Sequence, residues 1–312
     1  MLHSRQTAVA TVALVGTMAA GSSPAEAYCR STTCAGDCAR DADGCKTEGE
    51  PLYWPTLCAG FSLQEDGSQH IDMPVWRDVA FQSFGAWVFL DCGNGEATIS
   101  FQQQKDVECR RSEYDPDGPN ANVILIQDTK WEYKGVDNTL AKTTVSYDTE
   151  TGEILDSDIE MNHAYNEFTT GDDNVVYDLQ SILTHEIGHF IGLDHTLDYN
   201  ATMNAGYQQG TTELRTLELD DIEGICAVYP PSRDVVCDAE PNGGWHSECS
   251  PDLDDGEADG CSIVRPPHSF ARRAQATGSS SSPFRGGFAL ALALAGLVAW
   301  SRRRPRTHKT NP

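Results

Sequence analysis

Basic side chains are scarce in this chain of 312 residues, which contains 22 Lys and Arg against 47 Asp and Glu. Ten of the basic residues lie before residue 28 or after Cys261, whereas only Glu26 of the acidic residues does. Residues 28–261 therefore carry 12 basic against 46 acidic side chains. A surface with this charge repels nucleic acid and anionic membranes, so we exclude nucleic-acid recognition and interpret the acidic excess as a solubility feature.

The chain also contains no uninterrupted apolar segment of about 20 residues, the length that a membrane-spanning helix needs. The longest candidate, Phe288–Trp300, has 13 residues, and extending it to Gly286–Ser301 gives 16. Arginines follow directly, as at the cytoplasmic end of a span. We predict a hydrophobic span with an Arg-rich tail over 288–312, after a Pro/Ser/Arg/Gly linker over 262–287. This arrangement resembles the C-terminal sorting tags of some bacterial surface proteins, which implies membrane anchoring or processing of the tail.

Residues 1–27 have the features of a secretory signal peptide. Arg5 precedes an apolar run, Val9–Ala20, and Ala25–Ala27 is a small-x-small cleavage site. Such a segment directs export and is then removed, so we expect an extracellular or cell-surface protein. Its contact with the membrane would be made by the C-terminal span.

Export makes the eleven cysteines interpretable as disulfides. Their spacing matches no four-ligand zinc ribbon. An odd count leaves one thiol unpaired, modified or bonded to another chain, and Cys261 is the candidate for modification. Spacing does not determine the connectivity, although Cys92 and Cys109 bracket a short expected strand and could be paired.

The stretch His185–His195 has the pattern H-E-x-x-H-x-x-G-x-x-H. His185 and His189 are four residues apart, so on a helix they share a face and can bind one ion. Gly192 can adopt a positive φ, which lets the helix end and the chain turn back to bring in His195. Three imidazoles leave a fourth tetrahedral position open, as a catalytic zinc requires. The pattern arises by chance in on the order of one chain in ten thousand, so we set aside merely solvated or capped histidines.

These eleven residues resemble the zinc-binding helix of the metzincin metalloproteases, and their flanks resemble the matrixin branch. Met203 stands where that family has its Met-turn beneath the histidine rings. Tyr207 matches a tyrosine in the wall of the main specificity pocket, although Ala205 replaces the usual proline. Residues 219–229 resemble the family's closing helix. The resemblance covers about residues 53–230.

The resemblance implies a zinc-dependent endopeptidase that acts on proteins or peptides. His185, His189 and His195 would bind one Zn²⁺, and Glu186 would act as general base and then general acid. Many animal matrixins bind a second, structural zinc through a histidine-rich loop that is missing here. We therefore expect no structural zinc and interpret His163 as a surface residue.

The implied fold is α+β, with a twisted, mostly parallel sheet, one antiparallel edge strand, an active-site helix and a smaller C-terminal subdomain. The residue pattern predicts strands at 60–71 (an edge strand and turn), 97–101, 122–127, 143–147 and 154–159. In metzincins the last of these would be the antiparallel edge strand with which a substrate backbone pairs.

Two helices are expected. The first starts at Pro74 and is amphipathic, with core-facing positions at Val75, Val79, Phe84, Trp87 and Val88. The second is the zinc helix over 177–190, with Asp178 as its cap. Its expected core-facing residues are Leu179, Ile182, Leu183 and Ile187.

We divide the exported chain into a Cys-rich cap (28–52), a catalytic domain (53–231) and an acidic, Cys-containing appendage (232–261). Asp37, Asp41 and Asp43 place carboxylates at alternating positions, so a calcium loop is the alternative for the cap. A weak calcium site is likewise the alternative for the appendage.

The competing interpretation of the whole chain is non-enzymatic: a surface-tethered metal-binding or adhesion protein without turnover. Glu186 argues against it, because a relic site has no physical reason to keep that carboxylate. A narrow peptidase that cleaves only partners in its own envelope is a second alternative. The sequence leaves the natural substrate and the oligomeric state open.

Overall fold

The computed structural model describes residues 28–133 and 139–250, which belong to one compact unit. The expected signal peptide, Cys261, the linker and the C-terminal span lie outside these residues. Within the described part, no helix is long and apolar enough to cross a membrane. The boundaries that we expect at residues 52 and 231 stay predictions.

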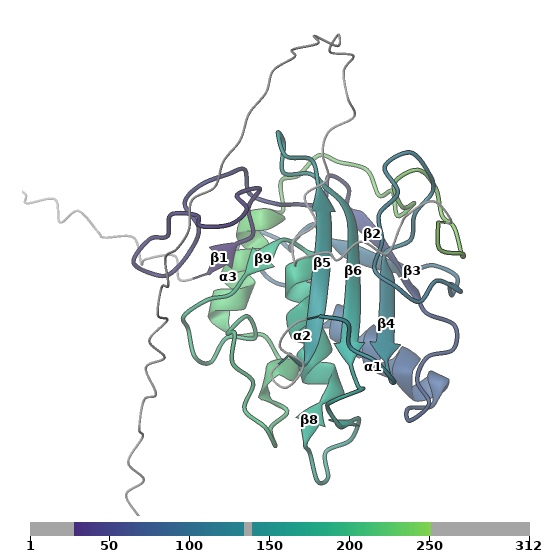
Figure 1. Ribbon diagram of the computed structural model, residues 1–312. Helices are drawn as coiled ribbons and strands as arrows, with labels where there is room; N and C mark the ends of the chain where they lie inside the picture. Colours follow the sequence, from purple (N-terminus) through teal and green to yellow (C-terminus); the bar gives the residue numbers. More distant parts are fainter. Residues whose placement is uncertain (1–27, 134–138, 251–312) are drawn as a thin grey trace, which may run out of the picture. The chain divides into compact units, whose positions relative to one another are not determined.

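A five-stranded mixed sheet forms the centre of the molecule, in the order β3-β2-β4-β6-β5 (Figure 1). Its strands are β2 (Cys58–Leu63), β3 (Ser100–Gln103), β4 (Val123–Gln127), β5 (Ala141–Tyr147) and β6 (Ile154–Asn162). The first four positions in this order run parallel, and β5 pairs antiparallel with β6. The α+β class is therefore confirmed.

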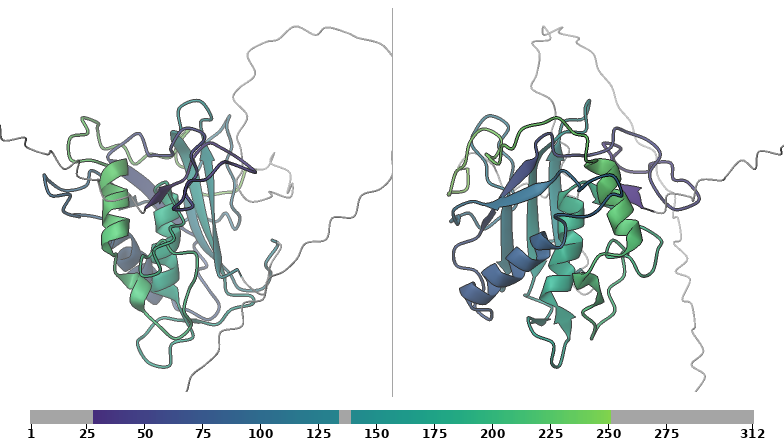
Figure 2. Two further views of the ribbon diagram at one scale, coloured as in Figure 1. Left: turned by 90° about the vertical axis from the view of Figure 1, so that its left-hand side faces the viewer. Right: turned by 180° about the vertical axis from the view of Figure 1, so that it is seen from behind.

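Helices α1 and α2 cover one face of the sheet, and α3 lies farther out on the same side (Figure 2). The helices are α1 (Met73–Gly85), α2 (Leu179–Phe190), α3 (Leu219–Val228) and the short 3-10 helix η1 (Glu213–Arg215). Two-residue strands form two further pairs: β1 (Cys29–Arg30) with β9 (Leu193–Asp194), and β7 (Phe168–Thr169) with β8 (Tyr177–Asp178).

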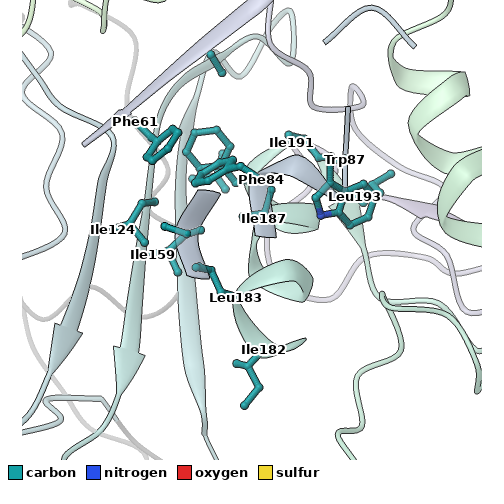
Figure 3. Packing of buried hydrophobic residues seen from close by; sticks show 14 of the residues in the cluster. Phe61, Phe84, Trp87, Ile124, Ile159, Ile182, Leu183, Ile187, Ile191 and Leu193 are labelled. Atoms are coloured by element: carbon teal, nitrogen blue, oxygen red, sulfur yellow. The ribbon is translucent and has the colours of Figure 1, made fainter. Parts of the chain in front are cut away.

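The hydrophobic core fills the space between the sheet and helices α1 and α2 (Figure 3). Phe61 of β2 stacks on Phe84 of α1, with ring centroids 3.9 Å apart. Phe84 in turn meets Phe190, the last residue of α2, edge to face. The zinc helix is thus anchored to the sheet through α1, and the four core-facing residues expected on it are all buried.

The N-terminal cap of α2 is the residue that the sequence predicts. Asp178 is the N-cap, and its carboxylate accepts a hydrogen bond of 2.9 Å from the backbone N–H of Ser181. The same carboxylate receives two hydrogen bonds from Arg215, at 2.6 and 2.7 Å. This fully buried cap fixes where the helix starts, two residues later than expected.

The sheet edges differ from the prediction. β5, not β6, is the antiparallel edge strand, and β2 lies inside the sheet with β3 at the opposite edge. The resemblance to metzincins, rather than the residue pattern, led to the expectation that β6 is the edge. The carboxylates that alternate along β6 are buried: Asp158 accepts hydrogen bonds from the backbone N–H groups of Val123 and Glu113.

The first helix and the strand after it also differ in detail. α1 ends at Gly85, so Trp87 and Val88 follow it rather than belonging to it. Trp87 is nevertheless fully buried and donates from its indole N–H to the carbonyl of Thr184 in α2, at 2.9 Å. Val75 is exposed, and the strand expected at 97–101 begins only at Ser100.

Ten of the eleven cysteines lie in the described residues, and they form five disulfides. The pairs are Cys29–Cys45, Cys34–Cys38, Cys58–Cys237, Cys92–Cys226 and Cys109–Cys249. The suggested Cys92–Cys109 pair is wrong, because each partner is bonded to a cysteine beyond the zinc helix. Cys92–Cys226 ties the segment after α1 to α3, and the other two long-range bridges tie residues 237–249 to the sheet region.

The disulfides should contribute unequally to stability. Replacing Cys92 and Cys226 by serine should lower the free energy of unfolding by about 4 kcal/mol, because the bridge closes a long loop that the other bridges only partly shorten. Replacing Cys34 and Cys38, four residues apart, should cost about 2 kcal/mol. Urea titration of both double variants measures the difference, and equal losses would contradict it.

Candidate metal centre

Three histidine nitrogens converge at the C-terminal half of α2. The Nε2 atom of His195 lies 3.1 Å from Nε2 of His185 and 3.1 Å from Nε2 of His189. His185 and His189 come from the helix itself, and His195 comes from the loop that follows β9. The structure thus brings together the three residues that the sequence spacing singled out.

The orientation of the two helix imidazoles is set by backbone carbonyls. Nδ1 of His185 lies 2.6 Å from the carbonyl oxygen of Thr202, and Nδ1 of His189 lies 2.9 Å from that of Leu193. A carbonyl only accepts, so each Nδ1 carries the proton. Each Nε2 lone pair is then free to bind a metal, an arrangement common among metal-ligating histidines.

The turn after α2 depends on Gly192, which adopts φ +92°. A Cβ atom at this position would lie 2.5 Å from the carbonyl oxygen of Leu52. Both the backbone conformation and the close approach of another segment therefore require glycine. The turn reverses the chain within three residues and delivers His195 to the other two imidazoles.

Two backbone carbonyls at the end of α2 accept hydrogen bonds from side chains of distant segments. Trp54 donates its indole N–H to the carbonyl of Phe190, and Tyr229 donates its hydroxyl to that of Ile191, each at 2.9 Å. Helix ends normally leave such carbonyls without an intrahelical partner. Here two large buried side chains from distant parts of the sequence satisfy them and hold the turn in place.

The Cys-rich N-terminal segment also braces this turn. β1 pairs antiparallel with β9, placing Cys29 opposite Asp194. Ser31 donates its backbone N–H to the carbonyl of Gly192 and its hydroxyl to that of Leu193, each at 2.9 Å. The segment that we expect to form a Cys-rich cap is therefore part of the support for His195.

Glu186 lies beside the three imidazoles and is almost fully buried, with 7% of its surface exposed. Its carboxylate accepts a hydrogen bond of 2.6 Å from the hydroxyl of Thr143 in β5. Burial raises the pKa of the Glu186 carboxyl above its ordinary value, while His185 and the Thr143 hydrogen bond oppose that shift. The result is a carboxylate held in one position with raised proton affinity.

Burial has the opposite effect on the pKa values of His189 and His195. It lowers the pKa of His195 to about 4, with His185 adding to the shift. It also lowers the pKa of His189 well below its ordinary value, again with help from the neighbouring histidines. These two rings are neutral at pH 7, which is the protonation state that binds a metal.

Met203 lies directly beneath α2. It is buried, and a Cβ atom added at Gly188 would meet its sulfur at 2.0 Å, so the helix and the Met-turn are in close contact. Asp221 of α3 holds that turn: its two carboxylate oxygens accept the backbone N–H groups of Thr202 and Met203 at 2.8 and 3.0 Å. The carbonyl of Thr202 accepts a hydrogen bond from Nδ1 of His185, so Asp221 positions this histidine indirectly, through Thr202.

Tyr207 is partly buried and its hydroxyl is fully used. It donates to the carbonyl of Thr211 at 2.6 Å and accepts the backbone N–H of Asp178 at 2.9 Å. Burial raises the pKa of this phenol above its ordinary value. The side chain therefore links the loop after Met203 to the start of α2, and it is not poised to transfer protons.

The donor set fits a zinc ion. Ligands 2.0–2.1 Å from Zn²⁺ at tetrahedral angles are separated from one another by about 3.3 Å, close to the two nitrogen–nitrogen distances of 3.1 Å. Three imidazole ligands, two of them oriented by backbone carbonyls, match a catalytic zinc site rather than a closed structural one with four protein ligands.

Calcium binding stays a prediction. In residues 28–133 and 139–250, the groups of three or more closely spaced metal-ligating side chains do not include Asp37, Asp41 or Asp43. The carboxylate of Asp41 accepts the backbone N–H groups of Asp43 and Cys45, which makes it part of a turn.

Sequence reasoning missed three supports of the site: Thr143, Asp221 and the pairing of β1 with β9. The strand containing Thr143 and the helix containing Asp221 were both expected, yet neither side chain has a spacing that reveals its partner. Only the short distance in space between these segments and α2 identifies them.

Residues 88–230 match the Matrixin family model. In its fold, its site and this match, the segment is similar to a matrixin-type peptidase domain.

Among curated proteins, the chain is 35% identical over 69 residues to metalloendoproteinase 1-MMP of Arabidopsis thaliana, which covers 22% of this chain and 19% of that protein. It is 40% identical over 68 residues to interstitial collagenase of Sus scrofa (22% and 13%) and 33% identical over 104 residues to matrix metalloproteinase-C of Caenorhabditis elegans (32% and 17%). The chain thus spans less than a fifth of the length of these relatives.

Gly192 should be irreplaceable. Changing Gly192→Ala should weaken zinc binding at least tenfold and lower the free energy of unfolding by about 2 kcal/mol or more, because the positive φ and the Leu52 carbonyl both oppose a Cβ. Zinc affinity is measured against a competing chelator. Gly85→Ala, whose Cβ would meet nothing within 4 Å, is the matched control and should leave both quantities near the wild-type values.

Proposed function

We propose that this chain is an exported, zinc-dependent metalloendopeptidase that hydrolyses peptide bonds in proteins or peptides. The observation that carries the proposal is the convergence of three Nε2 atoms, since those of His185 and His189 each lie 3.1 Å from that of His195, with the buried carboxylate of Glu186 beside them. The match of residues 88–230 to a peptidase family supports the same conclusion.

His185, His189 and His195 would hold the ion. Zn²⁺ bound there supplies Lewis-acid polarisation of the substrate carbonyl and activates water at neutral pH. Glu186 accepts a proton from the attacking water and returns it to the leaving amine, a role that its burial and raised pKa suit. Thr143 keeps the carboxylate in one position, which reduces the reorganisation needed during proton transfer.

The substrate backbone would pair with β5, the edge strand closest to α2. Strand addition orients a peptide through main-chain hydrogen bonds. Thr143 belongs to this strand and also binds Glu186, so the same element that aligns the substrate positions the general base. Tyr207 would form part of a wall for one substrate side chain, in a conformation fixed by its two hydrogen bonds.

Export is supported by the signal-like residues 1–27 and by the five disulfides, which persist in oxidising compartments. Anchoring through residues 288–312 stays a prediction. Collagen is the substrate named for some of the relatives, and no feature of this chain selects it, so we propose only proteins or peptides as the substrate class.

Changing Glu186→Gln separates enzymatic from non-enzymatic function. The variant should keep its zinc, because Glu186 is not a ligand, and should lose at least 100-fold in cleavage of casein, because the general base is gone. Glu150→Gln, an exposed carboxylate in the turn between β5 and β6, is the matched control and should cleave normally.

A zinc-loaded wild-type protein that leaves casein intact and cleaves nothing in a proteome-wide profile would instead favour the metal-binding or adhesion interpretation. Cleavage of only a few envelope proteins in that profile would identify a narrow peptidase. Equal activity of Glu186→Gln and the wild type would refute the mechanism.

Thr143 should act as a positioning residue. Removing its hydroxyl in Thr143→Val should reduce kcat/KM about tenfold and move the acidic limb of the pH–rate profile to higher pH, because the lost hydrogen bond stabilises the ionised form of Glu186. Thr143→Ser keeps the hydroxyl and should retain both rate and profile. An unshifted limb in Thr143→Val would show that the residue only supports the strand.

A further inference from the structure

A second group of metal-ligating side chains lies at the carboxyl ends of the central strands. Asp128 follows the last residue of β4, and His163 follows the last residue of β6. These strands are parallel neighbours, with Gln127 paired to Asn162, so the two residues lie next to each other at the carboxyl ends of the strands. His70, in the segment between β2 and α1, completes the group.

The three residues are close enough to share an ion. Each offers a ligand atom, and all three atoms lie within 4.8 Å of one another. Nδ1 of His163 is 3.6 Å from a carboxylate oxygen of Asp128, which is too long for a hydrogen bond. The separation is close to the roughly 3.3 Å expected between two tetrahedral ligands of one zinc ion.

The carboxylate is held in position by the segment that carries His70. Asp128 accepts a hydrogen bond of 2.8 Å from the hydroxyl of Ser68 and one of 2.6 Å from the backbone N–H of Gln69. The Ser68 hydroxyl oxygen also accepts the backbone N–H of His70, at 3.1 Å. Such hydrogen bonds to a ligand are typical of metal sites, because they orient its lone pairs.

The burial of His163 and Asp128 favours metal binding over an ordinary ion pair. Their side chains are only 10% and 9% exposed, so the interpretation of His163 as a surface residue is wrong. Burying an ionised carboxylate is costly unless a cation compensates for it, and a metal ion shared with His163 would provide that compensation.

Although the sequence led us to expect no structural zinc, we propose that His70, Asp128 and His163 form a second Zn²⁺ site, separate from the catalytic centre. Two imidazoles and one carboxylate suit zinc among the common divalent ions. The rings of His70 and His163 now stack with an angle of 10° between their planes. His70 is exposed, so its ring can turn to aim a nitrogen at the ion with little loss of packing. The ion would join the β2–α1 segment to the ends of β4 and β6.

The stoichiometry of zinc tests the site. The purified exported chain, equilibrated with Zn²⁺ and freed of excess by gel filtration, should contain two equivalents by mass spectrometry. His70→Ala and Asp128→Asn should each contain one, as should His189→Ala, which loses the catalytic site. His246→Ala, another exposed histidine, is the matched control and should retain two. One equivalent in the wild type, or two in both His70→Ala and Asp128→Asn, would overturn the proposal.

Thermal unfolding gives a second readout that is independent of catalysis. In the His189→Ala background, added Zn²⁺ should still raise the melting temperature, because the second site remains. The rise should disappear when His70→Ala is added to that background. A rise of equal size in both proteins would also overturn the proposal, whatever the outcome of the cleavage assays.

Discussion

The reversal of the chain at Gly192 is the constraint on which the candidate catalytic centre depends. His185 and His189 share a helix face by their spacing alone, but His195 reaches them only because residue 192 adopts φ +92° against the carbonyl of Leu52. A side chain at 192 is excluded twice, by the conformation and by the space. Residues from distant parts of the sequence, among them Ser31 and Tyr229, donate hydrogen bonds to this turn and stabilise it.

The periphery of the molecule therefore supports the site as much as the sheet does. The N-terminal segment pairs with β9, α3 holds the Met-turn through Asp221, and the Cys92–Cys226 bridge joins α3 to the segment after α1. Surface ion pairs contribute little to the stability of proteins. In this acidic chain, disulfides and buried hydrogen bonds stabilise the site instead. Their strength depends little on ionic strength, whereas repulsion between exposed carboxylates increases as the ionic strength falls.

The central sheet carries residues of both the proposed catalytic centre and the proposed second zinc site. Its free edge, β5, runs along α2 and carries Thr143, which binds the proposed general base. The carboxyl ends of β4 and β6 carry Asp128 and His163 of the proposed second zinc site. Parallel strands bring their ends together whatever lies between them in the sequence, so residues 35 positions apart become neighbours there.

The local pattern of the sequence determined the zinc helix, its cap at Asp178, the buried strand at 123–127 and the three histidines with their spacing. These features follow from interactions within a few residues, where helical and strand periodicity decides which side chains share a face. Only the tertiary structure decided that β5 rather than β6 forms the edge, how the ten cysteines pair, and that Thr143, Asp221 and His163 meet their partners. Most of those contacts join segments that lie far apart in the sequence, and they are set by the packing of the sheet and core rather than by any repeat in the chain.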